Sequence, residues 1–228
     1  MPSVQKILYF LSSAILIMIG VAVLGYGMSA EWASATMACG SSESSSYAGS
    51  ATIQMGLFKC NEIKEFCPFF SGTEEVQVFQ RLGKRGGAAV ALQALVVVLL
   101  VLALVASAGS ITVTLYNSVS NPYETYMGPI GLYICSGLSA CSAILAMVLY
   151  LINILGIKLA KEIMLGAFDV KLKDQTVEFL VGFYMLLPFI VVNMLAILLV
   201  YIYAHAAYTQ RREQQKPTED APKEIMMY

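Results

Sequence analysis

Four long stretches of the chain contain no Asp, Glu, Lys or Arg, and this pattern constrains the fold more than any other feature. They cover residues 7–30, 86–123, 125–157 and 179–210, and each is rich in Leu, Ile, Val, Ala and Met. About 20 predominantly apolar residues are enough to cross a bilayer as an α-helix. Lipid offers the backbone no hydrogen-bond partners, so a spanning segment must be helical. The sequence therefore predicts an all-α membrane protein with four transmembrane helices.

The four apolar blocks and the loops between them account for most of the 228 residues, so we expect one bundle rather than several domains. That bundle should occupy residues 1–210, with a large first loop at 28–87 and a polar tail at 211–228. The expected spans are residues 7–26, 88–110, 130–155 and 180–203.

The charge content excludes several classes of function. Charged residues make up 13% of the chain and the formal net charge is −1, so the basic surface that binds nucleic acid is missing. The chain has one histidine, His205, at the expected exit of the fourth span, and no Ser/His/acid or paired-carboxylate pattern. We therefore expect no enzyme activity, no cofactor or metal, and no small-molecule substrate. An ion path through the spans is also disfavoured, because none of them contains an acidic or basic residue.

Polar and helix-breaking residues within the spans suggest how the helices pack. Pro188 lacks a backbone N–H and should kink the fourth helix near Tyr184. Gln93, Asn153 and Asn193 are amides inside apolar blocks. We expect all three to form hydrogen bonds between helices.

The first loop is the only one large enough to fold by itself. Residues 52–57 alternate polar or small side chains with apolar ones, as in a half-buried strand, and residues 31–39 are a weaker candidate. A small sheet on the outer face of the bundle is therefore expected. Three cysteines of this loop, Cys39, Cys60 and Cys67, allow one disulfide and one remaining thiol.

A disulfide would place the first loop on the oxidising side of the membrane, with both termini in the cytosol. The distribution of Lys and Arg does not support this orientation, because the first and third loops together carry more of them than the termini. Long loops contribute little to that rule. The expected orientation therefore rests on the loop cysteines and on the family resemblance described next.

Several motifs resemble those of known membrane proteins. Trp32 followed by Gly56-Leu57-Phe58 and then by cysteine resembles the first loop of the claudin-like tetraspan superfamily. The form with Phe in the triplet resembles the clarin family. The turn into the third span and the apolar-Tyr end of the chain also resemble clarins. The turn motif comprises Asn121, Pro122, Gly128, Pro129 and Gly131.

The resemblance implies structural roles for the motif residues. Trp32 and the Gly-Leu-Phe triplet would hold a small extracellular sheet against the bundle. One disulfide would include Cys67, with Cys39 as its partner by clarin-like spacing or Cys60 by claudin-like spacing. The chain departs from the family in having no Asn-x-Ser/Thr sequon, so glycosylation is not expected.

The turn at 121–129 is expected to serve folding, because its prolines cannot donate backbone hydrogen bonds. Gly131 should allow close approach at the start of the third span. Small residues further along that span, namely Ser136, Gly137, Ala140 and Cys141, should form faces for tight helix packing. Cys135 is also expected to be a small packing residue.

The resemblance implies a non-enzymatic, multi-pass organiser or accessory protein of the plasma membrane. Such a protein acts through lateral and cytoskeleton-linked interactions with other proteins, in sensory-cell or epithelial maintenance. The alternative is a subunit associated with a channel or transporter. The last residues, Met226, Met227 and Tyr228, end in the pattern of a peptide that binds a cytosolic PDZ-type scaffold.

Overall fold

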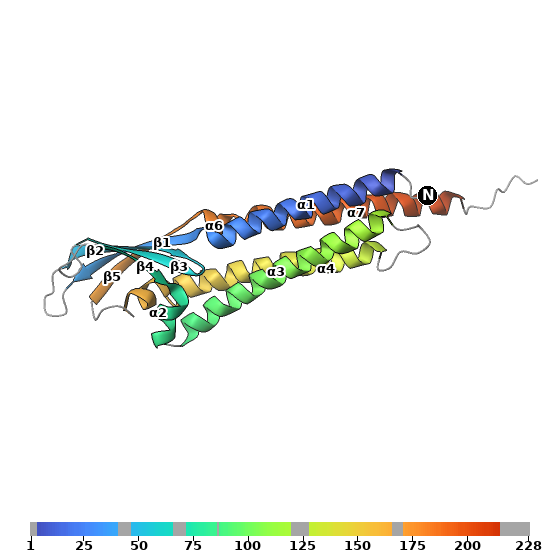
Figure 1. Ribbon diagram of the computed structural model, residues 1–228. Helices are drawn as coiled ribbons and strands as arrows, with labels where there is room; N and C mark the ends of the chain where they lie inside the picture. The colour runs from blue at the N-terminus through green and yellow to red at the C-terminus, as the bar shows by residue number, and fades with distance from the viewer. Residues whose placement is uncertain are drawn as a thin grey trace, which may run out of the picture.

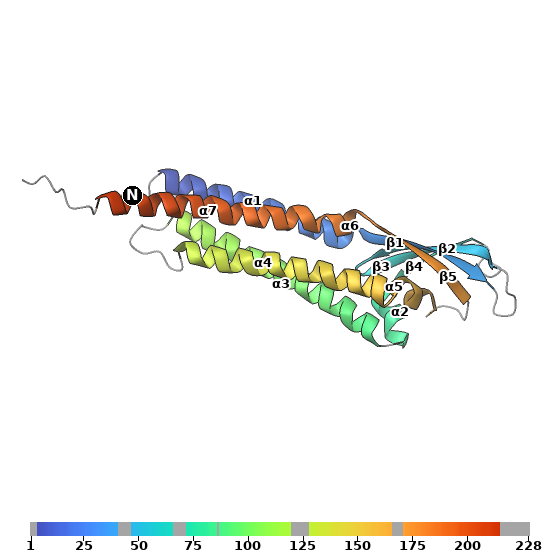
Figure 2. The same ribbon diagram turned by 180° about the vertical axis from the view of Figure 1, so that it is seen from behind.

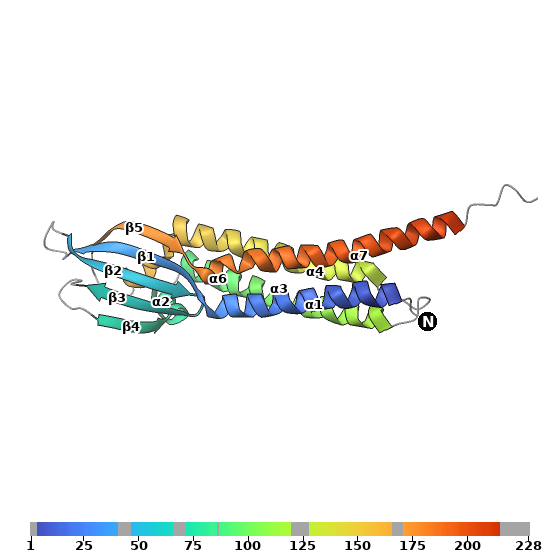
Figure 3. The same ribbon diagram turned by 90° about the horizontal axis from the view of Figure 1, so that it is seen from above.

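The computed structural model describes residues 4–40, 47–65, 72–85, 87–119, 128–165 and 171–214. It is an elongated molecule, with a bundle of long helices and a β-sheet at one end of that bundle (Figure 1). Four helices are long and apolar enough to cross a membrane, which confirms the four predicted spans. The start of the first helix and the end of the last lie at the end opposite the sheet (Figure 3).

The spanning helices run past the ends of the expected spans at 7–26, 88–110, 130–155 and 180–203. The first is α1 (Val4–Ser29), the second α3 (Ala88–Val119), and the third α4 (Gly128–Leu151), which continues as a π-helix, η1 (Ile152–Gly156). The fourth is α7 (Leu186–Gln214), preceded by the single turn α6 (Val181–Tyr184). At 1.5 Å per residue, α3 is about 48 Å long, more than the roughly 30 Å of hydrocarbon.

The break between α6 and α7 confirms the predicted kink. It falls at Met185, one residue after Tyr184. Pro188 has no N–H to donate to the Tyr184 carbonyl, so the regular helical bond is missing there. The next bond, from Phe189 N to Met185 O, is long at 3.5 Å.

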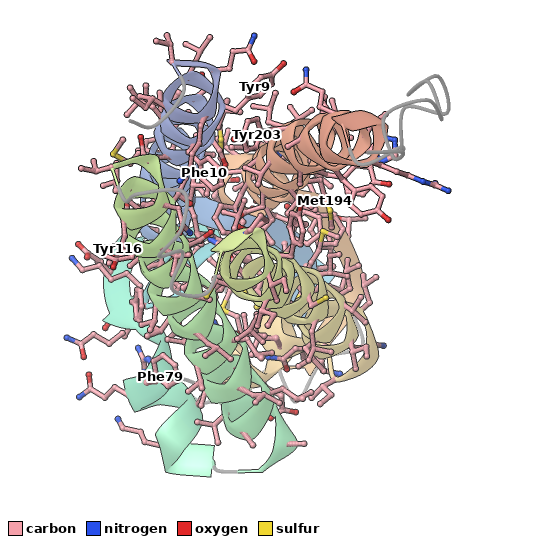
Figure 4. The ribbon with its side chains drawn as sticks, turned by 90° about the vertical axis from the view of Figure 1, so that its right-hand side faces the viewer. Tyr9, Phe10, Phe79, Tyr116, Met194 and Tyr203 are labelled. Atoms are coloured by element: carbon pink, nitrogen blue, oxygen red, sulfur yellow. The ribbon has the colours of Figure 1, made fainter. Side chains whose placement is uncertain are left out.

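The four spanning helices form a closed ring of contacts. Helix α1 packs on α7 and on α3, and α4 packs on α3 and on α7 (Figures 1 and 2). At the end opposite the sheet, Phe10 of α1 meets Tyr203 of α7 edge-on, with ring centroids 5.8 Å apart. Tyr9 lies 5.7 Å from the same ring (Figure 4). Aromatic packing therefore joins α1 to α7 at the end of the bundle where the termini lie.

Pairs of serines connect α3 and α4. The hydroxyl oxygens of Ser107 and Ser139 are 2.8 Å apart, and those of Ser110 and Ser136 are 2.6 Å apart. All four side chains are fully buried. Such short contacts require close helix backbones, which small residues permit. The buried position of Ser136 in this contact confirms its predicted role in tight packing.

The prediction that small residues form packing faces on α4 is only partly correct. Ala140 is fully buried, as predicted. A Cβ added at Gly137 would have no atom within 4 Å, and Cys141 is exposed, so these two face away from the other helices. The face of Ser136 and Ala140 is therefore confirmed, and the face of Gly137 and Cys141, about 100° away around the helix, is wrong as a packing face.

A five-stranded antiparallel sheet covers one end of the bundle, in the order β4-β3-β2-β1-β5. The first four strands lie between α1 and α3, so the expected sheet in the first loop is confirmed. The fifth comes from the segment before the last span, which the sequence did not predict. The strands are β1 (Glu31–Gly40), β2 (Tyr47–Gly56), β3 (Lys59–Glu65), β4 (Gly72–Gln77) and β5 (Lys171–Phe179).

The two faces of the sheet differ in character. The inner face is apolar and buried, with Ala35, Met37, Ile53 and Met55 among its side chains. Two short helices, α2 (Val78–Arg85) and α5 (Leu159–Leu165), lie beneath the sheet, beside the ends of α3 and α4 (Figure 1). The outer face is polar, with the exposed contact between the Thr36 and Thr52 hydroxyls and the exposed ion pair of Lys59 and Glu75. One continuous hydrophobic core therefore joins the sheet to the bundle.

Candidate functional site: the junction between sheet and bundle

Trp32 lies at the centre of the junction, as its predicted role requires. Its indole is fully buried, and Nε1 donates a hydrogen bond of 2.8 Å to the carbonyl of Gly27 in the last turn of α1. The indole ring meets Tyr150 of α4 edge-on, with centroids 4.9 Å apart. Phe183 of α6 lies 6.3 Å away in a similar arrangement. One side chain at the start of the sheet thus contacts three of the four spanning segments.

Gly182 makes room for that indole. A Cβ added at Gly182 would lie 2.5 Å from Trp32 Cδ1 and 2.8 Å from the carbonyl oxygen of Glu31. The backbones also bond directly, because Leu180 N donates to Trp32 O at 2.9 Å. The fourth span therefore begins in contact with the first strand, and only glycine permits the observed spacing.

The Gly56-Leu57-Phe58 triplet forms the turn between β2 and β3. A Cβ at Gly56 would lie 3.2 Å from the Lys59 carbonyl oxygen and 3.3 Å from that of Ala30, so little space is left for a side chain. Leu57 is buried, whereas Phe58 is 46% exposed. The triplet therefore combines a close backbone approach, an apolar anchor and an exposed aromatic ring.

Buried amides link this turn to two spans. Gln93 of α3 donates from Nε2 to the Leu57 carbonyl at 3.1 Å. Asn153 of η1 donates from Nδ2 to the Ala89 carbonyl at 3.3 Å and to Gln93 Oε1 at 3.4 Å. The predicted interhelical role of Gln93 and Asn153 is thus confirmed.

The prediction for Asn193 is wrong. Its Nδ2 donates to the carbonyl of Phe189, four residues earlier in the same helix, at 3.0 Å. Within a helix, a side chain can reach the carbonyl one turn back without help from a neighbour. The bond lies just beyond the break at Met185.

The cysteines of the first loop differ in state. Cys39 is disulfide-bonded, whereas Cys60 is a buried free thiol. Cys135 and Cys141 of the third span are also free thiols, the first partly buried and the second exposed. Burial of Cys60, and then the nearby Glu62 carboxylate, raise the pKa of its thiol from 9.0 to about 12. A thiol with such a pKa is a weak nucleophile at neutral pH. Cys67 lies outside the described residues.

Charged side chains beneath the sheet are paired within the first loop. Glu62 is fully buried, and Lys64 Nζ lies 3.0 Å from its Oε2. Arg81 of α2 contacts Glu74 of β4 at 3.3 Å. In the described part of the chain, no group of three or more His, Cys, Asp and Glu side chains could hold a metal ion. The Arg81–Glu74 pair joins α2 to β4, and the Lys64–Glu62 pair lies within β3.

The other predicted motif residues lie at the far end of the bundle or beyond the described ranges. Gly128 has a positive φ of 38°, and its carbonyl accepts a 3.1 Å bond from Asn117 Nδ2. Gly131 is buried after Pro129. His205 is exposed and stacks on Tyr201, with centroids 6.1 Å apart. The remaining predicted residues, Asn121, Pro122, Met226, Met227 and Tyr228, lie outside the described residues.

The structure adds junction residues that the sequence did not single out. Tyr150 and Phe183 complete the aromatic cluster around the indole of Trp32, with ring centroids 6.0 Å apart. Gly182 could have been noticed in the sequence, because it is a glycine near the start of an apolar block. Nothing in the pattern of α4 distinguishes Tyr150 from an interfacial aromatic residue.

Four spanning helices, a sheet over one end of them, and a buried Trp and Gly-Leu-Phe turn at their junction define a claudin-like tetraspan membrane protein. Clarin-3 of Mus musculus is 33% identical to the chain over 232 residues, and clarin-3 of Rattus norvegicus is 31% identical over 235 residues. Clarin-3 of Homo sapiens is 29% identical over 234 residues. All three alignments cover 100% of both chains. The chain belongs to the clarin family and is most like clarin-3. No family profile matches it.

Proposed function

We propose that this protein is a non-enzymatic organiser of the plasma membrane, which acts by binding other membrane proteins laterally and cytosolic scaffolds at its tail. The proposal is supported by how the buried polar side chains are used. Trp32 and Gln93 form hydrogen bonds that hold the sheet on the bundle, and Asn153 bonds to Gln93 and to the Ala89 carbonyl between the second and third spans. The chemistry of the junction is therefore internal, and binding falls to the exposed surfaces.

The proposed orientation puts the sheet outside the cell and both termini in the cytosol. Two observations support it. The start of α1 and the end of α7 lie at the same end of the bundle (Figure 3). The disulfide-bonded state of Cys39 fits an oxidising compartment at the sheet end. The exposed Arg212 near the end of α7 would then face the cytosol.

The tail supplies the proposed link to the cytoskeleton. A free carboxylate after Met226-Met227-Tyr228 would lie among backbone amides of a PDZ-type domain, with alternate side chains in pockets. Scaffolds of that type connect membrane proteins to the cell cortex. Membership of the clarin family supports the proposed role in sensory-cell or epithelial maintenance.

Proximity labelling can test this proposal if the labelling enzyme is fused to the N-terminus, which leaves the C-terminal carboxylate free. The native chain is compared with one that carries a single added Ala after Tyr228. We expect PDZ-domain proteins to be labelled only with the native tail, while the set of labelled membrane neighbours stays the same. Equal labelling of PDZ-domain proteins by both forms would contradict the role of the tail. Labelling that matches an unrelated four-span protein would contradict the organiser function.

A further inference from the structure

A hollow of about 510 Å³ opens on the outer face of the sheet, where α1 ends. Its walls come from the last turn of α1, the start of β1, the turn between β2 and β3, and β4. Polar groups inside it include the Glu31 carboxylate and the side-chain amides of Gln54 and Asn61. The partly exposed apolar residues of its lining are Met28 and Phe58. This combination suits a small amphiphilic group.

The charge of the hollow is negative. Lys59 and Glu75 at its edge neutralise one another, with Nζ and Oε1 2.6 Å apart. The carboxylate that remains is that of Glu31, whose Oε1 accepts a long bond of 3.4 Å from Asn61 Nδ2. An amide compensates a carboxylate only partly, because it carries no net charge. The hollow therefore favours a positively charged group.

The hollow also lies at the end of the first candidate span, where lipid headgroups are expected. Ile15, Met18 and Tyr26 are exposed along α1, and Ser29 at the edge of the hollow follows them at helical spacing. Tyr26 is 59% exposed, and Phe58 beside the hollow is 46% exposed. Exposed aromatic rings of this kind mark the boundary between hydrocarbon and water. A lipid that lies along this face of α1 would bring its headgroup to the hollow.

We propose that the hollow binds the headgroup of an ammonium-bearing phospholipid, of the phosphatidylethanolamine or phosphatidylcholine type. The ammonium group pairs with Glu31, and the amide of Gln54 donates to a phosphate oxygen. The acyl chains lie along the exposed apolar face of α1. The site is independent of the proposed binding of partners through the tail.

Native mass spectrometry can test the site on the full chain, released from nanodiscs that contain phosphatidylethanolamine and phosphatidylglycerol in equal amounts. A parallel set replaces phosphatidylethanolamine with phosphatidylcholine. We expect the native chain to retain the ammonium-bearing lipid over phosphatidylglycerol by about threefold, the scale of one exposed charge pair. Glu31→Gln should abolish that preference. Lys59→Gln should increase it, because Glu75 then loses its partner. Glu178→Gln, on β5 outside the hollow, should leave it unchanged.

Opposite effects of Glu31→Gln and Lys59→Gln cannot arise from a general loss of folding. The proposal is wrong if the native chain shows no preference, or if Glu31→Gln and Glu178→Gln behave alike. Excess soluble phosphoethanolamine should not displace the lipid, since it has no acyl chains to lie along α1. Displacement would mean that the hollow binds a free headgroup, and this too would overturn the proposal.

Discussion

The side-chain amide of Gln93 lies 3.1 Å from the main-chain carbonyl of Leu57 and donates a hydrogen bond to it. The donor belongs to the second span and the acceptor to a turn of the sheet. Gln93 and Leu57 are both buried, at 0% and 1% exposure. This bond therefore fixes the position of the sheet relative to the membrane helices where water cannot replace either partner.

Replacing Gln93 with Leu should destabilise the protein, because the Leu57 carbonyl loses this partner while buried. The free energy of unfolding should fall by about 1–3 kcal/mol. Thermal unfolding of purified protein in detergent measures the change. Thr112→Val is the matched control, since Thr112 is exposed and bonds only to the Ala108 carbonyl of its own helix. Equal losses for the two variants would show that the Gln93 bond is dispensable.

Gly182→Ala should also destabilise the protein, through crowding rather than a lost bond. The new Cβ would lie 2.5 Å from Trp32 Cδ1, so the indole or the backbone must move. We expect a loss of about 1–3 kcal/mol, the range for overpacked sites. Gly25→Ala provides the comparison, because a Cβ there meets no atom within 4 Å. A Gly182→Ala protein as stable as the Gly25→Ala protein would refute the account of this contact.

We predict that Cys39 pairs with Cys67, since Cys60 is a free thiol and the other two cysteines lie in the third span. Peptide mapping without reduction should recover the Cys39–Cys67 peptide. Cys39→Ser should lower stability by about 2–4 kcal/mol, as is usual for loss of a native disulfide. Cys60→Ala should retain the bridge. A mapped peptide that joins Cys60 to Cys67 would reverse the assignment.

The buried thiol of Cys60 should make stability depend on pH in the alkaline range. Its pKa is about 12 in the folded protein against an ordinary 9.0. Below the lower value the thiol is protonated in both states, so it contributes no pH dependence. Between the two values only the unfolded chain loses the proton, so the free energy of unfolding falls as the pH rises.

The test compares the native chain with Cys60→Ala at about pH 8 and about pH 10.5, so that other alkaline groups cancel. The native chain should lose more stability over this interval than the variant does. Parallel losses in the two proteins would show that Cys60 is not shielded in the folded state.

The proposed orientation predicts that epitope tags at both termini are inaccessible to antibodies on intact cells. A tag in the Ser-rich stretch at 41–46, between β1 and β2, should be accessible on the same cells. Immunofluorescence with and without permeabilisation makes the comparison. Staining of either terminus on intact cells would contradict the orientation.

The spans could be predicted because a charge-free apolar block has one stable form in lipid. The ends of the helices could not, because a helix continues into the headgroup layer without needing apolar side chains. Helix α7 illustrates this, since it runs to Gln214. The charged residues from 211 onward predict instead that this segment belongs to the tail. Composition marks the hydrocarbon, whereas backbone hydrogen bonds determine where the helix ends.

The sheet was predicted in part, for a similar reason. Strand β2 shows its alternation in the sequence because one of its faces is buried. Strand β5 does not, because its first four residues are Lys, Leu, Lys and Asp and it lies at an edge. Its strand form depends on pairing with β1, where Ala35 faces Val177. Such a distant pairing leaves no local signal.

The sequence motifs identified some residues of the junction, and the structure shows what those residues contact. Trp32 and the Gly-Leu-Phe triplet stood out from the sequence, but the partners that give them meaning did not. Gly182 and Tyr150 belong to other spans, and their roles arise only when the helices come together around the indole. Asn193 shows the converse, since its Nδ2 donates within its own helix and bonds to no neighbouring helix.

The place of β5 in the sheet has a consequence for synthesis of the chain. Strand β1 pairs with β2 on one side and with β5 on the other, and β5 follows the third span. A nascent chain that has inserted only its first spans therefore presents the mostly uncharged β1 as an open edge, a place that the charged β5 takes in the finished protein. Open edges favour aggregation and recognition by chaperones. Completion of the last loop thus acts as a checkpoint, and late truncations should be degraded even though their spans insert normally.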